Sequence, residues 1–157
     1  MIREIKIVKG QFLQKEGEYN TKGYIVKSGL LRSYSIDAKG KEHIFMFAPE
    51  NWIIADTTPP HLPSELYIDA LEDTLAIVFK KGEEDNPDVQ KLFSRLNVLQ
   101  KRIIMLMSAS SIERYEHFIE TYPNIIQRVP QRMIASYLGI TPEALSKVKG
   151  EQKKKGK

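Results

Sequence analysis

Apolar and polar positions alternate at short spacing through the first half of the chain, which predicts β-strands. Strands are expected over residues 24–36, broken by Gly23 and Gly29. Further strands are expected over residues 42–47, after a turn at 37–40, and as a pair over residues 67–80. Many short strands separated by glycine turns favour a rolled or closed antiparallel barrel. The proline-rich residues 57–63 are expected to form a surface loop.

After residue 82 the apolar period lengthens from two to about three and a half residues, which is typical of an amphipathic helix. Asn86-Pro87-Asp88 has the composition of a helix start. A helix over residues 88–108 would be about 30 Å long. Leucine and isoleucine recur along it at alternating spacings of four and three, a coiled-coil seam that predicts a dimer interface. The seam consists of Leu92, Leu96, Leu99, Ile103 and Leu106.

A second apolar face of this helix contains Phe93, Ile104 and Met107. Two apolar faces indicate that the helix packs against its own barrel and also against a partner. The alternative is a long core helix within a single subunit.

Residues 131–150 have the pattern of a helix-turn-helix. Two crossing helices need a small residue at their closest approach and a turn residue that tolerates a positive φ, and Ala135 and Gly139 meet these needs. Thr141-Pro142 supplies an N-cap and the proline that often opens a helix. The inward positions are apolar: Ile134, Leu138, Ile140, Leu145 and Val148. The alternative to a DNA-binding unit is a structural hairpin with no nucleic-acid role.

Charge is unevenly distributed along the chain, whose net charge is +4. Residues 127–157 contain eight basic and two acidic side chains, so this segment carries +6 and residues 1–126 carry −2. A basic segment over a helix-turn-helix favours binding to double-stranded DNA. The side chains expected at the DNA interface are Arg128, Gln131, Arg132, Thr141, Pro142, Glu143, Ser146, Lys147 and Lys149.

Glu143 is expected to read a base edge, because an acid beside phosphates is unfavourable unless it accepts a hydrogen bond, for instance from the cytosine amine. The alternative is that Glu143 only complements the dipole at the start of its helix. Lys147 is expected to donate to guanine or to phosphate. Arg128, Gln131, Arg132 and Lys149 are better placed for contacts to the DNA backbone.

Composition excludes several other classes of protein. The 157 residues are 41% hydrophobic and 28% charged, which is globular composition, and they include no cysteine, so disulfides and cysteine-ligated metals are ruled out. The three histidines are scattered without a ligand spacing, so no metal site, cofactor or catalytic activity is expected. Short apolar runs and the absence of a signal-peptide pattern predict a soluble cytoplasmic protein.

Residues 23–34, 37–42, 114–118, 128–131 and 134–147, in this order of barrel, long helix and helix-turn-helix, resemble the Crp/Fnr family of bacterial transcription regulators. The run Ile-Ala-Ser-Tyr-Leu-Gly-Ile-Thr-Pro-Glu is similar to the branch of the family common in Bacteroidetes. The resemblance implies an α+β fold: an antiparallel β-roll (a double-stranded β-helix of the cyclic-nucleotide-binding type) over 1–87, a dimerisation helix and connector over 88–121, and a helix-turn-helix with a basic tail over 122–157. It also implies a homodimer on a palindromic DNA site, with RNA polymerase as a further candidate partner.

The chain departs from the family pattern in two places. The stretches that match the cyclic-nucleotide cassette, residues 52–56 and 64–70, contain no arginine, and Ser64 stands at its position. A buried phosphate without a cation is costly, so cyclic AMP is not expected to bind in the usual way. The second departure is the lack of a full β-wing after the helix-turn-helix, in whose place the lysine-rich tail is expected to contact phosphates.

An unknown effector is expected to contact a pocket in the roll lined by Trp52, Ile54, Asp56, Ser64 and Tyr67. The alternative is that these side chains only fill the core. A cupin-like binding or enzymatic barrel is a rival function, but it would need a histidine cluster that this sequence lacks. A second rival is an interaction module whose helical hairpin does not bind DNA, in which case the basic helix faces would be covered in the dimer.

Overall fold

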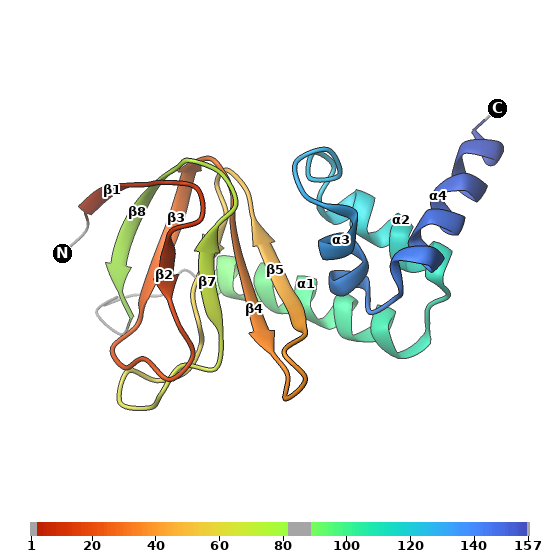
Figure 1. Cartoon of the computed structure of the whole chain (residues 1–157). Helices are drawn as coiled ribbons and strands as arrows, with labels where there is room; N and C mark the ends of the chain where they lie inside the picture. The colour runs from red at the N-terminus through yellow and green to blue at the C-terminus, as the bar shows by residue number, and fades with distance from the viewer. Residues whose placement is uncertain (1–2, 82–88, 157) are drawn as a thin grey trace. The chain divides into compact units, whose positions relative to one another are not determined.

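A computed structural model describes residues 3–81 and 89–156, and the chain divides into two compact units, Met1–Asp85 and Asn86–Lys157. Among the described residues the first unit contains eight strands and the second contains four helices (Figure 1). The α+β class and the order of strands before helices are therefore as the sequence predicts. The boundary expected after residue 121 lies inside the second unit, and the three-part division stays a prediction.

The strands of the first unit form two antiparallel sheets, with the orders β1-β8-β3-β6 and β2-β7-β4-β5. The chain passes repeatedly from one sheet to the other, which produces the predicted roll (Figure 1). The strands are β1 (Arg3–Ile7), β2 (Phe12–Gln14), β3 (Lys22–Ser28), β4 (Leu31–Ile36), β5 (Glu42–Ala48), β6 (Ile53–Ile54), β7 (Tyr67–Ala70) and β8 (Thr74–Lys80).

The core of the roll is built from alternate strand positions, since successive side chains of a strand point to opposite faces. Leu31 of β4 pairs with Ala48 of β5 on one side and with Ala70 of β7 on the other, and all three are buried. Val26 and Ala76, paired between β3 and β8, are also fully buried. Small and large apolar residues thus alternate across each sheet and fill the interior.

Two glycines of the roll have different roles. Gly29 separates β3 from β4 with a φ of +93°, and a side chain there would collide with the backbone of Asp73. The sequence predicts that Gly23 interrupts a strand, but it lies within β3, where its missing side chain leaves space for the ring of Phe79. The close packing of this ring, which local sequence does not reveal, explains the difference.

The second unit contains α1 (Val89–Ser108), α2 (Ser111–Thr121), α3 (Gln131–Leu138) and α4 (Pro142–Lys155). α1 ends at the predicted residue, while its expected start at Asn86-Pro87-Asp88 lies outside the described residues. Ser110 begins α2 with a capping box, in which its backbone N–H donates to the Glu113 carboxylate at 2.7 Å. Hydrogen bonds from Ser110 lower the pKa of Glu113.

α4 is longer than the helix predicted from the sequence. It continues through Gly150, and the lysines expected in a tail instead form its last turn. Positive side chains at this end complement the negative end of the helix dipole, which favours the extension. These lysines are Lys153, Lys154 and Lys155.

Candidate nucleic-acid interface

The turn between α3 and α4 has the geometry of a helix-turn-helix. Gly139 ends α3 in the left-handed conformation, with φ 64° and ψ 33°, and its N–H donates to α3 carbonyls. The Thr141 hydroxyl accepts the N–H of Ala144 at 3.1 Å and so caps α4. The predicted inward residues Ile134, Leu138, Leu145 and Val148 are buried, and Ile140 is half-buried.

An aromatic cluster holds α3 against α2. The rings of Phe118, Tyr122 and Tyr137 lie with centroids 5.3 to 5.5 Å apart in tilted and edge-on arrangements. Burial raises the pKa of Tyr137. The Arg102 guanidinium of α1 lies 4.0 Å from the centroid of the Tyr137 ring and donates to the Tyr137 carbonyl at 3.2 Å. These contacts fix the position of α3 relative to the two preceding helices.

Arg114 of α2 joins the ends of two other helices. Its guanidinium donates to the carbonyls of Leu106 (3.0 Å) and Ala109 (3.1 Å) at the end of α1, and to that of Leu138 (3.0 Å) at the end of α3. A Cβ on Gly139 would lie 3.3 Å from the Arg114 Nη1 atom, so this glycine also allows the approach of Arg114. The sequence analysis assigns no function to Arg114, because its distance along the chain from the helix-turn-helix does not predict these contacts.

The predicted DNA-contacting side chains occupy two helix starts. On α4, Pro142, Glu143, Ser146 and Lys147 are exposed and Lys149 is half-buried. Around the start of α3, Gln131 and Arg132 are exposed and Arg128 is half-buried. Thr141 is exposed as well, and its hydroxyl is engaged in the cap of α4. The outward side of α4 therefore presents one acid, one hydroxyl and one lysine within its first two turns.

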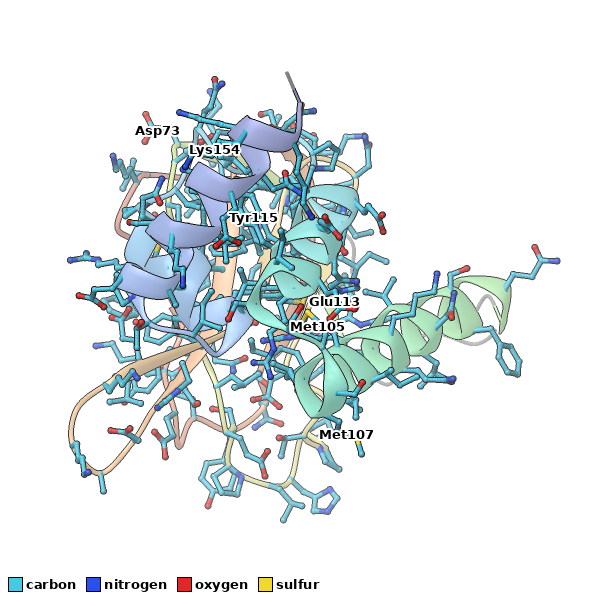
Figure 2. All side chains as sticks on the ribbon, turned by 90° about the vertical axis from the view of Figure 1, so that its right-hand side faces the viewer. Asp73, Met105, Met107, Glu113, Tyr115 and Lys154 are labelled. Carbon is cyan, nitrogen blue, oxygen red and sulfur yellow. The ribbon has the colours of Figure 1, made fainter. Side chains whose placement is uncertain are left out.

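The most exposed apolar side chains of α1 only partly coincide with the predicted seam. Met107 is 80% exposed, Phe93 66%, Ile103 58%, Ile104 54% and Leu96 50%, whereas Leu99 is half-buried. Leu106 is also exposed, and the side chain of Leu92 lies outside the described residues. Figure 2 shows Met107 projecting from α1 on the side away from Met105, which is buried.

Four of these exposed side chains, Phe93, Leu96, Ile103 and Met107, follow with the exposed Gln100 the spacing of three and four residues that a heptad seam would have, while the predicted seam stays a prediction. Two of these residues belong to the predicted seam, and the stripe as a whole is turned toward the second apolar face. The side of α1 that carries Met105 and Arg102 is used inside the unit, which explains the rotation.

Comparisons with known proteins agree with this architecture. No family model matches the chain. It is 27% identical to the fumarate and nitrate reduction regulatory protein of Yersinia pestis, over 97% of this chain and 69% of that protein. It is 26% identical to the anaerobic regulatory protein of Aggregatibacter actinomycetemcomitans, over 98% of this chain and 68% of that protein.

Solved structures share the whole fold. FixK2 of Bradyrhizobium japonicum has a TM-score of 0.81 at 22% identity, over 99% of this chain and 86% of that one. A transcriptional regulator of the CRP/FNR family from Thermus thermophilus has a TM-score of 0.73 at 16% identity, over 98% of this chain and 87% of that one. This chain has the fold of Crp/Fnr-type regulators. Its assignment to the Bacteroidetes branch stays a prediction.

In this chain, Asp56 and Ser64 of the predicted effector pocket are bonded to other parts of the roll. The Asp56 carboxylate accepts the backbone N–H groups of Thr58 (2.7 Å), Glu65 (2.9 Å) and Leu66 (3.0 Å). Burial alone would raise the pKa of Asp56, but hydrogen bonds from these residues outweigh burial and lower it. The Ser64 hydroxyl donates to the Lys15 carbonyl at 2.7 Å.

The other three predicted pocket residues also have contacts within the roll, and the effector pocket stays a prediction. Ile54 is fully buried in the core, Trp52 packs against the core, and Tyr67 stacks on Tyr34 with ring centroids 5.3 Å apart. A surface pocket of about 420 Å³ includes Ser64 but none of the other four. Its lining is Glu16, Gly17, Thr58, Leu62, Pro63, Ser64 and Glu65.

Gln14 is a buried residue of the roll that motif reasoning missed. Its side-chain amide donates to the Leu66 carbonyl at 2.6 Å and to the Asp56 carboxylate at 3.3 Å. The signal available in the sequence was only a polar residue directly after two apolar ones, at the end of β2. Within residues 3–81 and 89–156, no group of three histidine or acidic side chains is placed to hold a metal ion. Across the same residues, no helix has the length and apolar character needed to cross a membrane.

Proposed function

We propose that this Crp/Fnr-type chain is a homodimeric transcription regulator that binds palindromic double-stranded DNA through α3 and α4. The observation that carries the proposal is the exposed polar and basic side of α4, which sits on a helix-turn-helix with a buried apolar interior. The second helix of such a motif enters the major groove with its N-terminal residues against base edges. A DNA-binding role implies action in the cytoplasm.

Within this proposal, side chains of α4 and of the α3 start have separate tasks. Glu143, exposed in the first turn of α4, accepts a hydrogen bond from a base edge, and Lys147 one turn later donates to guanine or phosphate. Arg128, Gln131, Arg132 and Lys149 contact phosphates and fix the register of the protein on the duplex.

The proposed occupant of the exposed apolar stripe of α1 is a second copy of this chain. The stripe follows the three-and-four spacing of a two-stranded coiled coil over more than two turns of helix. An apolar stripe of this length is unfavourable in water, and burial against an identical stripe removes it. Two-fold pairing would present two helix-turn-helix units to a DNA site of the same symmetry.

A small-molecule effector and RNA polymerase are proposed as further partners. Cyclic AMP is not proposed as the effector, because the groups at the positions of the family cassette are engaged within the protein. Asp56 accepts hydrogen bonds from three backbone N–H groups, and Ser64 donates to a backbone carbonyl.

The proposal is tested by selecting binding sites for the full-length protein from a library of random duplex DNA. We expect enrichment of a two-fold symmetric sequence whose half-sites lie about 34 Å apart on one face of the duplex. The variant Lys147→Gln should bind the selected site more weakly, whereas Glu120→Gln, exposed on α2, should bind it like the wild type. Equal affinity of the wild type for the selected and a scrambled duplex would contradict sequence-specific regulation.

A further inference from the structure

Gly150 is an exposed glycine inside α4 that the fold itself does not require. A Cβ built there meets no other atom within 4 Å, and its φ is not in the left-handed region. Glycine in a helix interior is less stable than alanine, because it has more conformational freedom to lose. Neither a turn nor a close contact within the described chain offsets this loss of stability.

The side of α4 that carries Gly150 is exposed and basic. Residues three and four apart lie on the same side of a helix, so Lys147 lies one turn before Gly150, and Lys153 and Lys154 lie one turn after it. All three lysines are exposed, and Figure 2 shows Lys154 projecting from the last turn. Gly150 therefore forms a bare patch of helix backbone between ammonium groups.

The opposite side of α4 is fixed against the rest of its unit. Val148 is buried, and the Gln152 amide donates to the Glu116 carboxylate of α2 at 3.1 Å. These residues lie two positions before and after Gly150, on the far side of the helix. Gly150 consequently faces outward in a fixed orientation.

We propose that the phosphate backbone of one DNA strand passes over Gly150 in direct contact with the helix backbone, between Lys147 and the lysines of the last turn. This inference rests on the proposed DNA-binding function. Gly150 lies about 12 Å along the helix axis from Pro142, at the start of α4. The major groove is about 8.5 Å deep, and the side chains of the first turn extend beyond the helix end to reach the bases, so a helix that enters by its N-terminus passes the phosphates at the groove edge near this position.

Charge and shape both identify this partner as a phosphodiester strand. The patch is flanked by lysine ammonium groups, which complement the negative charge of the strand. Any side chain at position 150 would hold the strand away from the helix surface. Because phosphate contacts are independent of sequence, Gly150 would strengthen binding to selected and scrambled DNA alike.

The test is the variant Gly150→Ala in the full-length protein, with two measurements that should move in opposite directions. The helix unfolding midpoint, followed by far-UV circular dichroism, should rise by about 4 °C, because alanine is the better helix former. The dissociation constant for the selected duplex and for a scrambled duplex should each increase about tenfold. Gly150→Gln, with a longer side chain, should weaken binding further.

Gly156→Ala is the matched control, because it makes the same chemical change at the C-cap of the same helix. It should leave both dissociation constants within about twofold of the wild type. A Gly150→Ala variant with a raised midpoint and unchanged or tighter DNA binding would overturn the inference. A wild type that does not bind DNA would overturn the proposed function as well, and the wild-type measurement alone distinguishes this failure.

Discussion

Replacing Arg114 with alanine should destabilise the helical unit more than any exposed substitution in it. The side chain donates to carbonyls of Leu106, Ala109 and Leu138, which are end groups of α1 and α3 that lack partners within their own helices. Without the guanidinium, the last turns of α1 and α3 lose a shared donor. We expect this loss to reduce the free energy of unfolding without changing the strands of the roll.

The magnitude follows from the burial of each hydrogen bond. The bonds to Ala109 and Leu138 are partly buried, and hydrogen bonds from charged donors contribute about 1.5 kcal/mol or more each. The bond to Leu106 is exposed, so water can replace it at little cost. The expected loss is about 3 kcal/mol, equivalent to a midpoint about 12 °C lower for a unit of this size.

Two optical signals separate the two units in one experiment. All four described helices lie in the second unit, so far-UV circular dichroism during urea or thermal unfolding follows mainly that unit. The single tryptophan, Trp52, lies in the first unit, and its fluorescence follows the roll. Arg114→Ala should lower the dichroism midpoint and leave the fluorescence midpoint unchanged.

Arg114→Lys is the informative second variant, because lysine keeps the positive charge but its ammonium group can donate to only some of the three carbonyls that Arg114 contacts. We expect it to lose about half as much stability as alanine. A loss below about 1 kcal/mol for Arg114→Ala would refute the reasoning, since the carbonyls that lose the Arg114 donor would then be satisfied by water. So would equal shifts of both optical signals.

Other parts of the chain give further predictions. Leu96→Lys combined with Ile103→Lys should give monomers in light scattering, and a monomeric wild type at micromolar concentration would contradict the dimer. Calorimetry should detect no binding of cyclic AMP, and clear micromolar binding would show that the cassette positions are misassigned. Glu143→Ala should relax discrimination at one base pair of each half-site, at a cost of about 1–3 kcal/mol for the cognate base. Neutralising the three lysines of the last turn of α4 would remove six phosphate contacts from the proposed dimer and should instead flatten the slope of log K against log salt by roughly five units, for every sequence alike. The exposed Asp37 carboxylate bonds to His43 at 2.8 Å and accepts the backbone N–H groups of Lys41 and Lys39, and together these bonds lower its pKa from 3.8 to about 2, so they should be lost as the pH falls from about 4 to 2. In a carboxyl NMR titration, His43→Ala should return the pKa of Asp37 toward 3.8.

The helix-turn-helix was predictable because its determinants are local. Gly139, Thr141 and Pro142 act on the backbone within a few residues of themselves, and the apolar spacing on either side fixes which faces meet. The structure confirms this motif and moves only its end, since α4 continues past Gly150. Glycine lowers helix stability without stopping a helix that is capped at its start and has cations at its end.

The pairing of strands in the roll was not predictable, because it depends on residues far apart in the sequence. β8 lies between β1 and β3, and Gly29 is required by the backbone of Asp73, forty-four positions later. The hydrogen bonds of two predicted pocket residues were not predictable for a related reason. Residue type indicates that Asp56 and Ser64 can bind a ligand, but only the fold reveals that their hydrogen-bonding capacity is already used by the protein.

The seam of α1 shows how two valid patterns compete within one helix. Leu99 and Phe93 both fit alternating spacings of three and four with Leu96 and Ile103, so the sequence alone does not decide between them. The decision comes from the other side of the helix, where Met105 is buried and Arg102 binds Tyr137 of α3. The contacts that hold the helix-turn-helix therefore also determine which face of α1 remains for a second copy.

The same contacts bear on how a dimer would read DNA. Arg114 donates hydrogen bonds to the end of α1 and to Leu138, the last residue of α3. Arg102 of α1 donates to the carbonyl of Tyr137 in α3. A helix that pairs along α1 would thus carry its α4 at a set angle and height. In the proposed dimer a two-fold axis would relate the two copies, so a change in that angle would move both recognition helices in opposite senses along the duplex. The proposed distance between half-sites would consequently depend on the Arg114 and Arg102 contacts as much as on the pairing of α1.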